Sequence, residues 1–524
     1  MNAEHAFSAW PRFFIKNTCT ELSRDTVMKK SIFFFFLGLS FAIPPRLHAQ
    51  FIEDAIRIAE PVDAVNARSA GMGNAFIGVA DDFSALYWNP AGLGQLRHSE
   101  FSLALTNLNV SNNTSFLGQA STYDNSTTHL NSIGMALPFP VTQGSLVLAA
   151  GYNRLVNYTG ALSARAFNPT SSIQPSLFDE EDTYDMSWLL GLQQDGTFEI
   201  PVNGRVMQAQ DVLESGNLGS WSFGGSVEVA RNLLVGVSLN VITGTYRYER
   251  TFAENDEQNV YADSIGGIEG RNRIDFQSLE LNQSITQDVS GWSSKIGLLY
   301  NIKDVARIGL TIQTPMAVTV EEEFRMSGES RFSNAVTKDA IPKITNAYDV
   351  STSWVFGLGA SINPVPFVTL SADADVTDFS TISFDDASAE SVSRQSFEFK
   401  KYLTQTVSFR LGAEVTIPST GLTLRGGYGV SPTPFLKERA DDMTQVLLYG
   451  MGYRSRNYDL KTISFGAGYK LDDALTLNVA YMLRSYKTFT LNYIDPRASI
   501  PFEDFKTTED VSRTSMLLSI AYSF

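Results

Sequence analysis

Asp373 and Asp375 are the two carboxylates whose spacing comes closest to a reactive pair. Residues two apart in a strand point to the same face, so these side chains would stand side by side. Neighbouring carboxylates can divide general acid and general base work. Arg410, Glu414 and Arg425, however, fall on the inward parity of the following segments. The pattern therefore favours five charges that line the interior of the fold over a catalytic dyad.

The residues that most enzyme sites require are scarce in this chain. Beyond residue 49 the histidines are His98 and His129, and the single cysteine of the sequence, Cys19, lies before that point. Histidine-based metal sites and Ser-His or Cys-His catalysis therefore lack parts. Neither Gly-x-Ser-x-Gly nor Gly-x-x-x-x-Gly-Lys occurs. We expect no enzymatic activity, no metal and no cofactor.

The segments that carry the charges have the composition of membrane-facing strands. Charged residues make up 18% of the chain, against roughly 25% in soluble domains. Beyond residue 49 no run of about 18 apolar residues offers a helical membrane span, so a span must be a closed barrel. At the C-terminus large apolar residues alternate with small ones, as in Met516, Leu518, Ile520, Tyr522 and Phe524. A side-chain period of two places these five on one lipid-facing side.

The same two-sided pattern predicts an all-β fold of fourteen antiparallel strands. Their expected ranges are 99–110, 129–138, 145–156, 218–230, 232–249, 284–302, 305–324, 350–362, 367–379, 403–417, 422–431, 459–470, 475–490 and 509–524. Short and long connections alternate, as in outer-membrane barrels, whose short turns face the periplasm. The longest connection, 157–217, is expected to be an external loop with helical pieces at Met186–Leu192 and Val206–Leu213, which do not alternate.

The N-terminus is expected to be processed. From Met28 the sequence has Lys29 and Lys30, an apolar stretch and a cleavage site at Leu47-His48-Ala49, which together indicate a secretory signal peptide over residues 28–49. Residues 1–27 are interpreted as an upstream extension of the reading frame.

The remainder is divided into two parts. Residues 50–98 do not alternate and are rich in small side chains. Such a segment suits a plug, or hatch, inside a barrel too wide to be filled by its own side chains. Residues 99–524 are then the transmembrane β-barrel. Its acidic balance, a net charge of −16 for the whole chain, argues against a nucleic-acid partner.

Several motifs resemble those of one known family. The stretch Arg68–Leu93 holds a Gly-Met-Gly-x-Ala core, an Ala-Asp-Asp and Asn89-Pro90-Ala91, and Gln313-Thr314-Pro315 and Phe409–Glu414 follow in order. Over essentially all residues beyond 49 the chain resembles the FadL/TodX-type outer-membrane transporters of long-chain fatty acids and aromatic hydrocarbons. The resemblance implies a hatch inside a fourteen-stranded barrel, with ligand bound on the outer side. It also implies that a kinked strand leaves a gap through which ligand passes sideways into the membrane.

Particular residues are expected to have particular roles. Asn89-Pro90-Ala91 is expected to form a turn that docks the hatch, because Pro fixes the backbone and Asn can bond the chain two residues on; whether the turn also gates transport stays open. The resemblance implies that Phe51, Ile52 and Ile56 lie near the ligand pocket; the alternative is that they belong to a disordered periplasmic leader. Gly151 is the candidate for the kink, because glycine inside a strand often marks a bend; packing against the hatch is the alternative.

The expected function is transport of a hydrophobic small molecule across the outer membrane, by a monomer in contact with outer-membrane lipid. The large loops around 157–217 and 250–283 show no motif that identifies the molecule. Some relatives with this hatch and barrel are instead subunits of a protein-secretion system that shuttle cargo at the cell surface. That role is the alternative.

Overall fold

The computed structural model describes residues 52–178, 185–193, 199–262, 273–303, 305–385, 402–436, 454–455, 459–493 and 500–524, with residues 495 and 497. The predicted extension, the predicted signal peptide and Phe51 lie outside these residues. Within the described ranges, no helix is long and apolar enough to cross a membrane.

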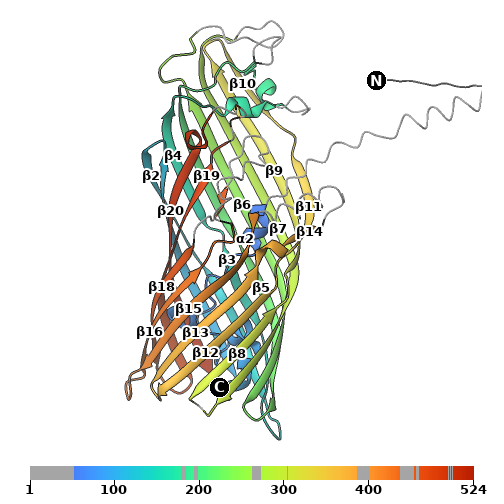
Figure 1. Ribbon diagram of the computed structural model, residues 1–524, viewed down its shortest axis with the longest axis vertical. Coiled ribbons are helices and arrows are strands. Elements are labelled where there is room, and N and C mark those ends of the chain that lie inside the picture. Colours follow the sequence, from blue (N-terminus) through green and yellow to red (C-terminus); the bar gives the residue numbers. More distant parts are fainter. Residues whose placement is uncertain are drawn as a thin grey trace, which may run out of the picture. The chain divides into compact units, whose positions relative to one another are not determined.

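Fourteen antiparallel strands close into a barrel (Figure 1). In the order in which they pair, they are β1 (Glu100–Phe116), β2 (Gln119–Phe139), β3 (Leu146–Asn157), β5 (Val206–Ala230), β6 (Leu233–Asn255), β7 (Phe276–Ile302), β8 (Ala306–Gln313), β12 (Val355–Val365), β13 (Val368–Asp378), β15 (Gln405–Thr416), β16 (Leu422–Ser431), β18 (Leu460–Lys470), β19 (Leu475–Leu491) and β20 (Lys506–Ser523). β20 pairs with β1 from Glu100 opposite Ser523 to Phe116 opposite Thr507, which closes the ring. The predicted fourteen-stranded antiparallel barrel is confirmed.

Additional strands extend the wall on the side away from the short turns. We call this side the outer half and the side with the short turns the inner half. They are β4 (Gly160–Asn168), β9 (Ala317–Phe332), β10 (Ala335–Ala340), β11 (Ile344–Ser351), β14 (Ser383–Asp385) and β17 (Arg454–Ser455). β4 pairs with β5, β9 pairs with β7, and β11 pairs with β9. Short helices accompany them: η2 (Gln174–Leu177), α5 (Met186–Leu189), η3 (Phe379–Thr381) and η4 (Phe502–Asp504).

The predicted external loop 157–217 is wrong in part. It contains β4 and the first half of β5, and Val206–Leu213 is strand rather than helix. The alternation of apolar and polar residues was hidden because Gln208 and Gln210 point inward. There they donate hydrogen bonds to the buried side chains of Glu254 and Asn492. The helix predicted at Met186–Leu192 is present as α5.

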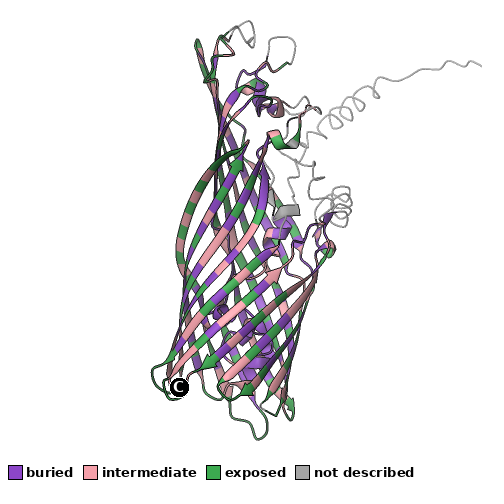
Figure 2. Cartoon of the chain, turned by 60° about the vertical axis from the view of Figure 1, so that its left-hand side comes forward, coloured by how far each residue is buried: buried purple, intermediate pink, exposed green. Residues whose placement is uncertain are grey.

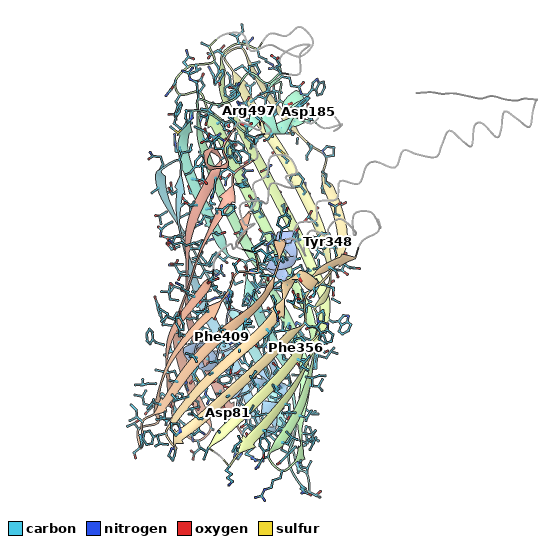
Figure 3. All side chains as sticks on the ribbon, viewed as in Figure 1. Asp81, Asp185, Tyr348, Phe356, Phe409 and Arg497 are labelled. Atoms are coloured by element: carbon cyan, nitrogen blue, oxygen red, sulfur yellow. The ribbon has the colours of Figure 1, made fainter. Side chains whose placement is uncertain are left out.

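The outward face of the inner half is a band of large apolar side chains, as the alternation predicts. In Figure 2 exposed and buried residues alternate along these strands, and Phe356 and Phe409, which Figure 3 labels on this part of the wall, are 50% and 59% exposed. The exception in the last strand is Leu517, which is fully buried while its neighbour Leu518 is 49% exposed. Leu517 packs against alanines of the N-terminal segment, which explains why an apolar residue occupies an inward position.

Cysteines placed on the outward face of β20 should locate the edge of the membrane band. Leu518 and Asp510 both face outward, and eight residues of strand separate them by roughly 27 Å. We expect Leu518→Cys to react only with a lipid-soluble maleimide and Asp510→Cys to react with a water-soluble one in intact cells. The background is low because no other cysteine lies beyond residue 49. Equal aqueous labelling of both positions would contradict the assigned band.

Residues 52–95 lie inside the barrel, most of them in its inner half, and are called the inner segment (Figure 1, blue). Its helices are α2 (Ile52–Ile58), α3 (Ala67–Gly71), α4 (Ala85–Trp88) and η1 (Pro90–Gln95). Small residues let its backbone touch the wall. Gly73 has a φ of 63°, and a Cβ there would lie 2.8 Å from the Tyr428 nitrogen. On the wall side, a Cβ on Gly236 would lie 2.3 Å from the Pro90 carbonyl carbon.

Candidate ligand-binding lining and passage inside the barrel

The five charges singled out in the sequence all point into the lumen. Arg410 pairs with Asp375 at 2.5 Å, and Arg425 pairs with Glu414 at 2.6 Å. Asp373 accepts a hydrogen bond of 2.8 Å from the Ile77 amide of the inner segment. In the described part of the chain, no group of three or more His, Cys, Asp or Glu residues could hold a metal ion.

These charges anchor the inner segment to the wall. Arg68 binds Asp81 at 2.6 Å and Glu414 at 3.0 Å, and Arg307 of β8 binds Asp81 at 3.1 Å. The side chains are largely buried, so each depends on its partner. Removing one member of a buried ion pair typically costs about 3–5 kcal/mol, because the other charge is left uncompensated.

Asn89-Pro90-Ala91 fastens the end of the inner segment to β5, β6 and β7. Asn89 is fully buried, and its Nδ2 donates to the carbonyl oxygens of Ile77 (3.1 Å) and Leu298 (3.2 Å). Its Oδ1 accepts from the Ala91 amide, as in an Asx turn. Ser226 of β5 donates to the Ala91 carbonyl at 2.8 Å. The turn therefore ties the inner segment both to itself and to the wall.

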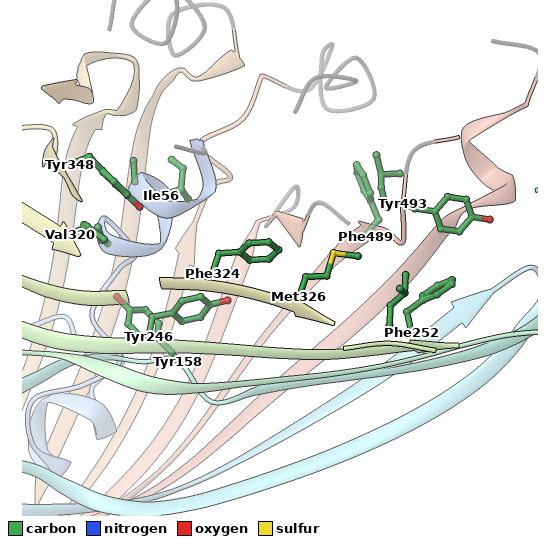
Figure 4. Close-up of a cluster of buried hydrophobic side chains, with 14 of the residues drawn as sticks. Ile56, Tyr158, Tyr246, Phe252, Val320, Phe324, Met326, Tyr348, Phe489 and Tyr493 are labelled. Atoms are coloured by element: carbon green, nitrogen blue, oxygen red, sulfur yellow. The ribbon is translucent and has the colours of Figure 1, made fainter. Parts of the chain in front are cut away.

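The outer half carries an apolar lining on its inner surface (Figure 4). Buried aromatic and aliphatic side chains from β6, β7, β9, β11, β19 and the residues just after β19 form it, among them Phe252, Phe276, Val320, Phe324, Met326, Tyr348, Phe489 and Tyr493. Ile56 of α2 belongs to the same cluster, near Tyr348. Of the other two proposed ligand contacts, Ile52 is described only in its backbone and Phe51 not at all.

A cluster of polar side chains holds α2 against this lining. Arg57 binds Asp54 and the Gln287 side chain, both at 2.9 Å, and Gln287 donates to Glu322 at 2.7 Å. Tyr348 donates to Asp54 at 3.2 Å. Burial, reinforced by the nearby charge of Asp54, raises the pKa of Glu322 above its ordinary value.

A second cluster of polar residues lies at the end of the apolar lining away from α2. Glu254 of β6 is fully buried and accepts hydrogen bonds from Ser172, the Ile173 amide and Gln208. Tyr493 donates to Ser171 at 3.0 Å. These bonds hold the segment after β4 across the lumen.

Between the apolar lining and the inner segment lies a cavity of about 170 Å³. Tyr87 and Trp88 of the inner segment border it on one side, and Lys295 donates to the Tyr87 carbonyl at 2.7 Å. Leu155 and Val156, at the end of β3, border both this cavity and the apolar lining. The cavity thus connects the lining to β3.

The wall is interrupted beside β2. β3 pairs with β2 only as far as Asn153 opposite Ser132, and in the described residues Gln119–Asn131 pairs with β1 alone. Gly151 lies within the regular part of this ladder, where a Cβ would meet the Phe83 ring at 2.5 Å. The irregularity falls later, between Arg154 and Val156.

The sequence pattern did not reveal the bend or most of the apolar lining. Phe252, Phe276 and Phe489 lie at or beyond the ends of the expected strands, where polar outward residues mask the alternation. The signal that could have revealed them is a set of large apolar residues that share one parity within a polar stretch, as do Phe324, Met326 and Phe332.

Comparison with known proteins agrees with this architecture. The fold resembles the crystal structure of a Pseudomonas aeruginosa FadL homologue, with a TM-score of 0.52, 12% identity and coverage of 89% of this chain and 100% of that one. It also resembles the Pseudomonas putida toluene transporter TodX, with a TM-score of 0.50, 13% identity and coverage of 87% and 98%.

The search among curated proteins found no match. A family profile described as outer membrane protein transport protein (OMPP1/FadL/TodX) matches residues 58–524. The match includes nearly all of the inner segment and every strand of the barrel. The chain therefore belongs to the outer membrane protein transport protein (OMPP1/FadL/TodX) family.

Proposed function

We propose that this protein carries hydrophobic small molecules, long-chain fatty acids or aromatic hydrocarbons, across the outer membrane. The observation that carries the proposal is the apolar lining of the outer half, continuous through Leu155 and Val156 with the cavity and the interrupted wall. Burying apolar surface is worth about 25 cal/mol per Å², a gain that an open aqueous pore would not provide. The name of the toluene transporter TodX agrees with this class of ligand.

In this proposal the protein is a monomeric transport protein and not an enzyme. Ligand enters among the outer loops, meets the apolar lining and the N-terminal end of the inner segment, and leaves sideways beside β2 into the membrane. The inner segment serves as the hatch that blocks the lumen, and Asn89-Pro90-Ala91 holds it in place. The unpaired edge of β2 supports sideways release.

Two measurements test the proposal. Protein purified in a mild detergent should retain apolar molecules that mass spectrometry identifies as fatty acids or hydrocarbons. A strain lacking the gene should take up at least one of these classes more slowly, because slow passage of hydrophobes across the outer membrane would then limit uptake. Restoring the gene should restore the rate.

The opposite outcome favours the alternative role. If the deletion strain takes up all such compounds normally yet fails to display secreted proteins, and the purified barrel carries a partner protein with an empty lumen, the protein is a secretion-system subunit.

A further inference from the structure

β3 separates from β2 at a bend in the chain. β3 remains paired with β5 as far as Asn157, and β4 resumes that pairing at Gly160. On the side away from β5, β4 does not pair with β2 but lies inside the lumen. Asn112, an inward residue of β1, donates to the Ala161 carbonyl at 2.8 Å, so β4 runs along the inner side of β1. The bend from Leu155 to Thr159 therefore creates the gap beside β2.

The backbone groups of the bend must find partners other than β2. Tyr158 still donates to a carbonyl of β5. The Leu155 carbonyl instead accepts from the Asp63 amide, and the Asn157 amide donates to the Asp63 carboxylate, both at 3.0 Å. Buried backbone groups of this kind are costly to leave unpaired. Asp63 of the inner segment thus takes the place that β2 would occupy in a regular ladder.

Arg513 of β20 binds two further backbone carbonyl groups of the bend. It donates to the carbonyls of Asn157 at 2.7 Å and Thr159 at 2.9 Å. Arg484 of β19 stands directly opposite Arg513 in the ladder, so two positive charges meet on the inner face. The Asp63 carboxylate forms ion pairs with both. Like charges directly opposite in a sheet repel each other, and Asp63 offsets this repulsion.

The residues after Asp63 reach the other side of the gap. Asn131 sits in a bulge of β2, which turns its side chain inward. It donates to the carbonyls of Ala64 and Val65, both at 2.8 Å. Residues 63–65 therefore join the bend to the foot of the free edge of β2.

We propose that Asp63 is a positioning residue that, with Arg484 and Arg513, holds the bend in place and keeps the gap beside β2 open. The transport consequence rests on the proposed function, but the structural claim does not. Without the Asp63 carboxylate, the Asn157 amide loses its partner and the two arginines lose the carboxylate that pairs with both of them. The edge of β2 at Gln119–Asn131, which no strand of the described residues pairs with on the side away from β1, is then the nearest partner, and the bend straightens onto it.

Hydrogen exchange on the purified full-length protein tests the structural claim. In the unaltered protein the amides of Gln119–Asn131 that face away from β1 should exchange quickly. In Asp63→Ala the same peptide should gain protection, with exchange slowed about tenfold or more, since losing a hydrogen bond to a charged group shifts such an equilibrium by at least that factor. Asp63→Glu, which keeps the charge, should restore part of the fast exchange. Unchanged exchange in Asp63→Ala overturns the proposal.

Glu60→Gln is the matched control. Glu60 lines the same small pocket as Asn157, Thr159 and Arg513, but in the described part of the chain its carboxylate makes no hydrogen bond to the bend. Its replacement removes one negative charge from the pocket and should leave exchange of the β2 peptide unaltered. If Glu60→Gln slows exchange as much as Asp63→Ala, charge alone is responsible and the positioning role is wrong.

Transport assays then separate this role from simple structural damage. Asp63→Ala should lower uptake of a long-chain fatty acid or aromatic hydrocarbon about tenfold at equal amounts of folded barrel, while binding to the purified protein stays within about twofold. Equal losses of binding, folded protein and uptake would overturn the proposal. If the unaltered protein transports neither class, the proposed function fails while the exchange result still decides the role of Asp63. Should Asp63→Ala give too little folded barrel, Arg513→Gln removes two donors to the bend and carries the same expectations.

Discussion

Deletion of residues 51–95 should convert the protein into an ion-conducting pore. The inner segment fills the inner half of the lumen, and the wall facing it is rich in glycine, as at Gly236 and Gly427, whose missing side chains cannot fill the space. A fourteen-stranded ring is too wide to be closed by its own side chains. In planar bilayers the deleted protein should show large, stable conductance steps, whereas the unaltered protein should show almost none.

The barrel itself should survive this deletion. Its strands pair around the full ring without help from the inner segment, and water entering the lumen can solvate charges such as Asp373 and Glu414. A difference in mobility between unheated and heated protein in detergent gels checks that the barrel has folded. Conductance at the intact level, from a folded deletion variant, would show that these residues are not the plug.

Replacing Asn89 and Pro90 by alanine should slow uptake at least tenfold while leaving ligand binding measurable. Asn89 holds the carbonyl oxygens of Ile77 and Leu298, and each buried carbonyl left unsatisfied costs about 1–3 kcal/mol. The apolar lining lies in the outer half, away from this turn, so binding should persist. Uptake of a labelled fatty acid or aromatic hydrocarbon by cells, compared with its binding to purified protein, measures the difference.

Gln95→Ala is the control for the alanine pair. Gln95 also bonds buried carbonyls, those of Val79 and Ala80, but both partners belong to the inner segment. Its loss should destabilise the segment without releasing it from β7. If Gln95→Ala lowers uptake as strongly as the Asn89 and Pro90 pair, the turn has no special part in gating.

The faces of the barrel could be predicted from the sequence because they depend on local rules. A strand alternates every two residues, and an arginine facing lipid costs about 2–4 kcal/mol at the membrane midplane. Arg410 and Arg425 were therefore assigned to the lumen from their parity alone, and the structure places them there. The same rule failed at Val206–Leu213, where inward glutamines made a strand look irregular. There, burial is polar because Glu254 and Tyr493, distant in sequence, supply the partners.

The passage was decided only by the tertiary structure. Gly151 was the natural sequence candidate for a kink, yet it lies in regular ladder, and the bend lies at Leu155–Thr159, where no glycine stands. The bend depends on Asp63 and on Arg484 and Arg513, which come from opposite ends of the chain. A backbone group that leaves its neighbouring strand is stable only where another group replaces the lost hydrogen bond. Closure of the barrel brings these three residues together, and no local pattern in the sequence records that they meet.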